Sequence, residues 1–241
     1  MKPLAVLGLL TLSACATAPV DPYATAMPLP EPQMPLAAPE PALDPATAAR
    51  NFGMVVARME PSVEAECRAR LAGDNCDFQI VVDTSPGAPA NAFQTRDGSG
   101  RPIIAFTVAL IAEARNADEL AFVMGHEASH HILNHIPRQQ QTAAVGSVMS
   151  GVLAAALGGD PTAIRTARDL GAKVGALSYS KDFELEADAL GTVLAFNAGF
   201  DPEHGAAFFS RIPDPGNSFL GSHPPNSQRL AIVRQTLAQL R

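Results

Sequence analysis

The spacing of apolar and polar residues predicts a mainly helical chain with a few short strands. Residues 47–71 have helical spacing, and we expect this helix to break at Pro61 because proline cannot donate the backbone hydrogen bond. The segment DFQIVVD, residues 77–83, is rich in β-branched residues and predicts a strand. Residues 91–111 predict two strands around the turn DGSG, followed by a helix.

Further helices are predicted in the second half of the chain. Asn116 can cap a helix in which Glu119 is the reciprocal partner, and the helical pattern continues until Pro137. Residues 182–199 predict another helix that Gly199 closes, and the last helix follows SHPPN and runs to the C-terminus.

An uncharged segment, TAAVGSVMSGVLAAALGG, occupies residues 142–159 and is rich in small side chains. Its apolar core of about 15 residues is short for a membrane span, which needs about 20. The sequence therefore favours a buried or interfacial helix over a membrane-spanning one.

The N-terminal residues have the pattern of a processing signal. Lys2 precedes the apolar stretch LAVLGLLTL, and LSAC, which ends at Cys15, resembles a bacterial lipobox. That resemblance implies cleavage before Cys15 and acylation of Cys15. Ala16, at the next position, resembles a signal for sorting to the outer membrane. The alternative is an ordinary secretory signal. Residues 16–45 contain nine prolines and no hydrophobic periodicity. We expect a signal peptide at 1–14, a lipidated Cys and Pro-rich tether at 15–45, and a folded domain at 46–241.

Composition narrows the class of protein. Of the 241 residues 47% are hydrophobic and 17% are charged, which is typical of one domain with a well-filled core. The formal net charge is −7 and no Lys/Arg cluster is present, so nucleic acid is not an expected partner.

Cys67 and Cys76 are expected to form a disulfide. An exported domain folds in an oxidising compartment, where a close cysteine pair is more often a disulfide than a metal site. Closing this short loop would stabilise the fold by about 2.7 kcal/mol. Two reduced cysteines are the alternative if the chain is not exported.

The stretch VMGHEASHHILNH, residues 123–135, holds four of the six histidines. At about 100° per residue, His126 and His130 lie about 40° apart on adjacent helical turns, where two imidazoles can bind one ion. Glu127 points about 100° away from His126, so we expect it to contact a metal-bound water as a catalytic base rather than the ion itself.

Catalytic zinc needs a third protein ligand. In YSKDFELEADALG, Glu184 and Asp188 are four residues apart and share a helix face. Glu184 can coordinate the ion, and Asp188 can accept a hydrogen bond from the second nitrogen of a ligating histidine. Glu186 faces elsewhere and is expected on an ordinary solvated surface.

The remaining histidines of this region are not predicted ligands. On one continuous helix, His131 and His135 point away from His126 and His130, and we expect them to have packing or surface roles. His204 is expected to be exposed in the first turn of a helix.

These motifs together resemble a known peptidase family. His126-Glu127-Ala128-Ser129-His130 and the later ELEAD motif, with NAFQT, DELAFVMGHE, AGFDP and SHPPNSQR around them, are similar to the gluzincins that include HtpX-type heat-shock proteases and CaaX prenyl endopeptidases. The chain looks like the short periplasmic lipoprotein branch. The resemblance implies one zinc ion with Glu184 as third ligand and Asp188 as its orienting neighbour. In the family, the histidine corresponding to His223 lies at the active site. The expected role of His223 is either to stabilise the oxyanion or to occupy the open zinc position and hold the enzyme latent.

The resemblance also implies an α+β, mostly helical, zincin-like fold with a small sheet. The edge strand of that sheet would border the zinc site, where peptides bind by strand addition. The expected function is zinc-dependent endopeptidase action on unfolded or misassembled cell-envelope proteins, at the outer membrane facing the periplasm. Outer-membrane assembly proteins are possible partners, and a lipid anchor would provide the membrane contact. A non-proteolytic periplasmic chaperone or assembly factor is the alternative, and an envelope scaffold is a third possibility.

Overall fold

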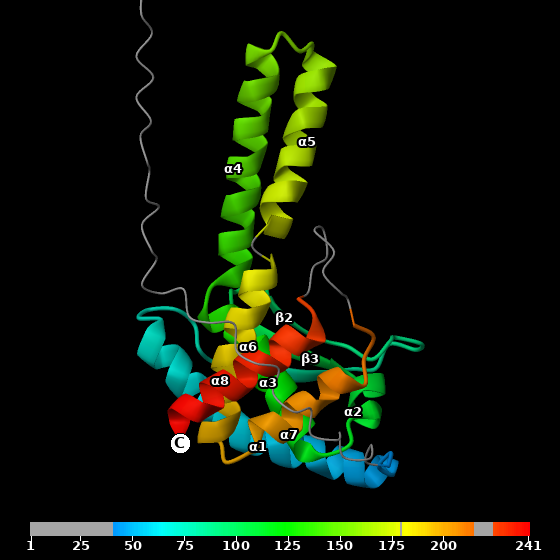
Figure 1. The fold of residues 1–241 in the computed structure, drawn as a ribbon. Coiled ribbons are helices and arrows are strands. Elements are labelled where there is room, and N and C mark those ends of the chain that lie inside the picture. Colours follow the sequence, from blue (N-terminus) through cyan, green and yellow to red (C-terminus); the bar gives the residue numbers. More distant parts are fainter. Residues whose placement is uncertain (1–40, 179, 215–223) are drawn as a thin grey trace, which may run out of the picture. The chain divides into compact units, whose positions relative to one another are not determined.

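A computed structural model of the chain describes residues 41–178, 180–214 and 224–241, all within one compact unit, Glu40–Arg241 (Figure 1). The described residues are mostly helical and include one small sheet, so the predicted fold class is confirmed. The helices are α1 (Pro45–Arg70), α2 (Val108–Glu113), α3 (Ala117–Ile132), α4 (His135–Ala156), α5 (Pro161–Ser178), α6 (Ser180–Asn197), α7 (Pro202–Ala206) and α8 (Asn226–Leu240), with a short 3-10 turn at Ala207–Ser210. The strands are β1 (Gln79–Asp83), β2 (Ala92–Arg96) and β3 (Pro102–Thr107).

The sheet has the order β1-β3-β2, which leaves β2 at one edge. Strand β1 runs parallel to β3, with Gln79 opposite Ile103, and β2 runs antiparallel to β3, with Ala92 opposite Phe106. The central strand β3 is the most buried of the three, and β2 contacts α3. The predicted edge strand is therefore present beside the helix that carries the HEASH motif.

Helix α1 continues through Pro61, so the predicted break is wrong. Val55, Met59, Val63 and Cys67 follow one another at intervals of four and are fully buried. This stripe extends on both sides of the proline and packs against the other helices, which offsets the lost backbone hydrogen bond. The predicted disulfide between Cys67 and Cys76 is present, with a Cα–Cα distance of 5.7 Å.

Helix α3 begins at the predicted cap, where the Asn116 side chain accepts a hydrogen bond from the backbone of Glu119. It ends earlier than Pro137, the predicted stop. The chain turns at Asn134, which has a left-handed backbone with φ of 56°, and α4 begins at His135. Pro137 thus lies in the first turn of α4, where backbone N–H groups have no acceptor within the helix, so the missing N–H of proline costs no hydrogen bond.

Residues 142–156 of the uncharged segment belong to α4, which forms a hairpin with α5 (Figure 1). Helix α5 was not predicted. The expectation that this segment is buried is wrong, because Val145, Val148, Met149 and Val152 are all more than half exposed. Within the described ranges, no helix combines the length and the hydropathy that a membrane span requires.

Helix α3 packs against α1, α6, α7, β2 and β3, so it lies at the centre of the fold. Eleven of its residues are buried, which holds the histidine motif firmly in place. The predicted signal peptide, the lipidation site Cys15, most of the tether and His223 lie outside the described residues.

Candidate metal centre

Two glycines let α3 and α6 approach closely at the site. A Cβ atom added to Gly191 would lie 2.8 Å from the backbone nitrogen of His126, and one added to Gly125 would lie 2.8 Å from the carbonyl oxygen of Gly191. Both distances are shorter than real Cβ contacts, so any larger residue would separate the helices. Because Glu184 lies two turns before Gly191 on α6, this close crossing sets its position relative to the α3 histidines.

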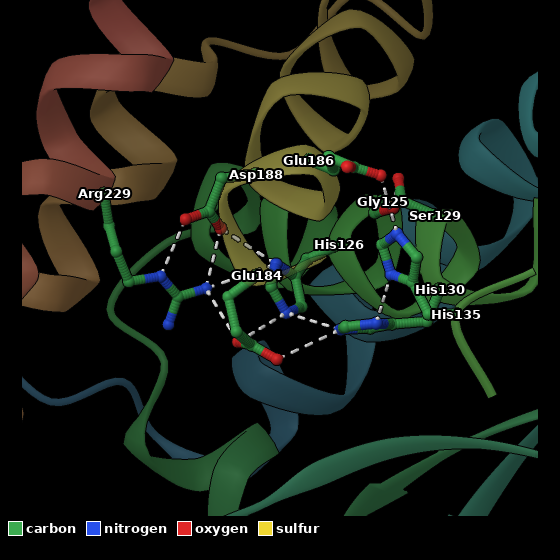
Figure 2. A network of polar contacts seen from close by, with 9 residues as sticks. All are labelled: Gly125, His126, Ser129, His130, His135, Glu184, Glu186, Asp188 and Arg229. Atoms are coloured by element: carbon green, nitrogen blue, oxygen red, sulfur yellow. Dashed lines mark hydrogen bonds and ion pairs between the residues drawn. The ribbon is translucent and has the colours of Figure 1, made fainter. Parts of the chain in front are cut away.

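His126, His130 and Glu184 come together as a cluster that could hold a metal ion (Figure 2). One ligand atom from each lies within 4.8 Å of the others. The Nε2 atoms of the two histidines are 3.1 Å apart, and each lies 3.5 Å from a Glu184 carboxylate oxygen. Two imidazoles and one carboxylate match a catalytic zinc ligand set, which leaves a fourth position open.

Asp188 and Arg229 form a buried ion pair behind His126. Oδ1 of Asp188 lies 2.8 Å from Nδ1 of His126, and the guanidinium of Arg229 donates to both Asp188 oxygens at 2.7 and 2.6 Å. Asp188 is fully buried and Arg229 nearly so. This arrangement directs Nε2 of His126 toward Glu184. Sequence reasoning missed Arg229, although it is the last residue of the SHPPNSQR motif.

His135 contacts the site, contrary to the prediction that it points away. Its Nδ1 lies 2.8 Å from Nδ1 of His130, and its Nε2 lies 3.2 Å from the Glu186 carboxylate. The prediction assumed one helix up to Pro137, whereas the turn at Asn134 redirects the chain. This turn places His135 behind His130.

Glu186 is likewise more than a solvated surface residue. It accepts a hydrogen bond from Arg138 at 2.6 Å and lies against His135. The hydrogen bond from Arg138, with a further contribution from His135, holds the pKa of Glu186 below its ordinary value despite partial burial. A chain of polar contacts therefore runs from His130 through His135 to the base of α4 (Figure 2).

Glu127 lines a cavity of about 610 Å³ together with His126, His130 and Glu184. Burial raises the pKa of Glu127 to about 7, and the nearby carboxylate of Glu184 adds to this increase. The edge strand β2 contributes Phe93 and Gln94 to the cavity wall. Much of the rest of the wall is apolar and includes Leu110, Phe122, Phe208 and Phe209. The cavity thus combines a carboxyl group that titrates near neutral pH with an apolar wall.

The two histidines of the cluster have opposite protonation tendencies when no metal ion is bound. Burial lowers the pKa of His126, but hydrogen bonds with Asp188 and Glu184 outweigh it and raise the value to about 10. Burial and the neighbouring charge of His126 lower the pKa of His130 to about 3. A proton on His126 therefore competes with a metal ion for this site.

The other histidines have the packing and surface roles that were expected. His131 is buried, stacks edge to face on Phe78 and lies 3.1 Å from the carbonyl oxygen of Asn75. His204 is in α7, partly exposed, with its Nδ1 2.8 Å from a carboxylate oxygen of Asp118.

Comparison with known proteins places this site in a family. The sequence model of peptidase family M48 matches residues 54–237. The beta-barrel assembly-enhancing protease of Escherichia coli K12 is 32% identical over 146 residues, which cover 55% of this chain and 30% of the relative. A putative beta-barrel assembly-enhancing protease of Vibrio cholerae is 30% identical over 186 residues, 69% of this chain and 38% of the relative. The mitochondrial metalloendopeptidase OMA1 of Arabidopsis thaliana is 26% identical over 166 residues, 67% of this chain and 32% of the relative.

The chain thus spans about a third of the length of the curated relatives it matches. The matched region nonetheless covers more than half of the chain and includes α3 and α6 with His126, His130 and Glu184 of the candidate cluster. The chain belongs to peptidase family M48.

Proposed function

We propose that the chain is a zinc-dependent endopeptidase. The observation that carries the proposal is the convergence of His126, His130 and Glu184 beside Glu127, in a cavity that an edge strand borders. These three side chains would hold one zinc ion. When bound, zinc polarises the scissile carbonyl and lowers the pKa of a bound water.

Glu127 serves as the general base and acid in this proposal. Its carboxylate can accept a proton from the attacking water and then donate it to the leaving amine. Asp188 and Arg229 hold His126 in one orientation, and His135 contacts His130 from behind. These contacts restrict ring rotation, which preserves the ligand geometry during turnover.

An extended, unfolded polypeptide is the substrate that fits this cavity. Strand β2 is an edge strand, so its outer backbone groups can pair with a substrate strand. The exposed apolar side chains of Phe93 and Ile136, which line the cavity, offer contacts to residues that a folded protein would bury. We infer that the chain degrades unfolded or misassembled cell-envelope proteins.

Two observations support an envelope location. The E. coli and V. cholerae relatives are named beta-barrel assembly-enhancing proteases. The N-terminus has a secretory pattern with a lipobox-like ending at Cys15, which would attach the protein to the membrane through lipid. We propose that it acts at the periplasmic side of the outer membrane, where assembly proteins are possible partners.

Glu127→Gln tests the enzymatic proposal. The variant should keep its zinc but lose at least about 100-fold in the rate of casein cleavage, because the amide cannot accept a proton. Glu113→Gln is the matched control, since Glu113 is exposed at the end of α2, and it should retain full activity. Undiminished cleavage by Glu127→Gln, or cleavage insensitive to a zinc chelator, would overturn the proposal.

A second candidate function is a non-proteolytic chaperone or assembly factor for outer-membrane proteins. The edge strand and the apolar cavity favour it, because both could bind an unfolded chain without cleaving it. Under this alternative, wild type and Glu127→Gln would suppress aggregation of an unfolded outer-membrane protein equally, and neither would shorten it on a gel.

A further inference from the structure

The α4–α5 hairpin is packed through small residues. A Cβ atom added to Gly146 would lie 2.2 Å from the carbonyl oxygen of Gly171, and one added to Gly175 would lie 2.3 Å from that of Thr142. The two backbones are therefore in direct contact at these positions, and further along the Arg168 side chain of α5 lies against Gly151. On α4, the residues at this contact are all small; they are Thr142, Ala143, Gly146, Ser150 and Gly151.

The large apolar residues of α4 lie on its other side. Their exposed fractions run from 57% to 65%, and they share a face about 140° wide at about 100° per residue. They are Val145, Val148, Met149, Val152 and Leu153, and Leu157 continues the apolar surface at the helix end with 79% exposed. In water, a helical hairpin buries its large apolar residues between the helices. This hairpin has the opposite arrangement, which is typical of helices surrounded by lipid.

The charges of the hairpin agree with a membrane surface. No charged residue occurs from 139 to 159, which covers most of α4 and its outward face. Helix α5 also exposes Leu170 and Val174, and it carries three basic residues and one acidic residue. Together α4 and α5 carry four basic and two acidic residues, counting Asp160 at the loop, a net charge of +2 in a chain of −7.

We propose that the α4–α5 hairpin docks on the surface of an anionic lipid bilayer, with the outward face of α4 buried among the lipids. The described helices are too short or too polar to cross a membrane, so the hairpin lies in the interface. Lipid fits better than a second copy of the chain. The hairpin has a net charge of +2, which an anionic bilayer complements, whereas a second copy would bring the same positive charge.

This contact would hold the candidate metal centre close to the membrane. Helix α4 begins at His135, which contacts His130, and its second residue, Ile136, lines the cavity. The inference goes beyond peptide hydrolysis, because it assigns a membrane contact that does not depend on a lipid anchor.

A single tryptophan can test the docking directly, because the chain contains no Trp. Met149→Trp in the full chain places the fluorophore on the outward face of α4, where residue 149 is 65% exposed. With vesicles of phosphatidylethanolamine and phosphatidylglycerol, its emission should shift to shorter wavelength. Lipids brominated about 5–10 Å below the headgroups should quench it.

Val82→Trp is the matched control, because Val82 lies on β1 and is 41% exposed. An N-terminal anchor would bring both variants to the vesicle, yet only the tryptophan at 149 should be quenched. Adding Val148→Glu and Val152→Glu to Met149→Trp should abolish the quenching, and neutral vesicles should quench less than anionic ones at low salt.

Two results would overturn the proposal. One is water-like emission at position 149 with every vesicle, while the protein itself sediments with them. The other is a blue shift that rises with protein concentration and needs no lipid, which would identify a second copy of the chain as the occupant. Quenching at 149 that exceeds quenching at 82 would support the proposal.

Discussion

Replacing Gly191 with alanine should separate α3 from α6 and weaken the metal site. The new Cβ would lie 2.8 Å from the backbone nitrogen of His126, whereas ordinary contacts begin at 3.4 Å, so the helices must move apart by about 0.6 Å. Zinc–ligand distances vary by only about 0.2 Å. Because His126 is on α3 and Glu184 is on α6, separating the two helices also separates these two ligands. We expect zinc affinity to fall about 10-fold or more.

The same substitution should also reduce the free energy of unfolding. Overpacking costs about 1–3 kcal/mol, while alanine is a better helix former than glycine by about 1 kcal/mol. The net loss for Gly191→Ala is therefore about 1 kcal/mol. Gly53→Ala is the matched control, because Gly53 is in α1 with no atom within 4 Å of the added Cβ. This control should gain about 1 kcal/mol from helix propensity alone.

Urea unfolding of the metal-free variants and competition with a zinc-binding dye would measure both effects. The two alanine variants should differ by about 2 kcal/mol in unfolding free energy, and only Gly191→Ala should bind zinc more weakly. If Gly191→Ala were stabilised like Gly53→Ala and kept wild-type zinc affinity, the close crossing would not determine the site geometry.

Three further outcomes follow from the contacts of the site. Arg229→Met removes the guanidinium partner of the buried Asp188 carboxylate and leaves it paired with His126; it should lower the unfolding free energy by about 1.5–3 kcal/mol in denaturant titrations, and a loss below about 1 kcal/mol would contradict this. Cys67→Ala should lower stability by about 2–3 kcal/mol and remove the sensitivity to reductant that we expect in the wild type. Zinc binding at pH 7 should release about one proton from His126, whose pKa is raised to about 10, and affinity should increase with pH. Calorimetry in two buffers of different ionisation enthalpy measures this release, and identical heats would refute it.

Sequence reasoning predicted what depends on local geometry. The i, i+4 spacing of His126 and His130 and the cap at Asn116 require only a regular helix, and both the histidine pair and the cap are found at α3. The disulfide required only a short separation between Cys67 and Cys76. These features are encoded within a few residues of one another.

Features that depend on tertiary packing were missed. The buried stripe of α1 overrides the helix-breaking tendency of Pro61. A left-handed residue at Asn134 ends α3 early and places His135 against His130, and no glycine there indicated such a turn. Arg229 pairs with Asp188 across 41 residues, a distance at which sequence periodicity carries no information.

The hairpin joins the chain at the two places that supply the candidate ligands. Helix α4 starts five residues after His130, and α6, which follows α5 directly, carries Glu184 in its second turn. A bound ion would therefore link the two ends of the hairpin and close a loop of more than fifty residues. Binding equilibria at linked sites are reciprocal. A ligand that binds the hairpin and changes the spacing of its ends must therefore change the affinity for the metal. Metal binding must then change the affinity for that ligand by the same free energy.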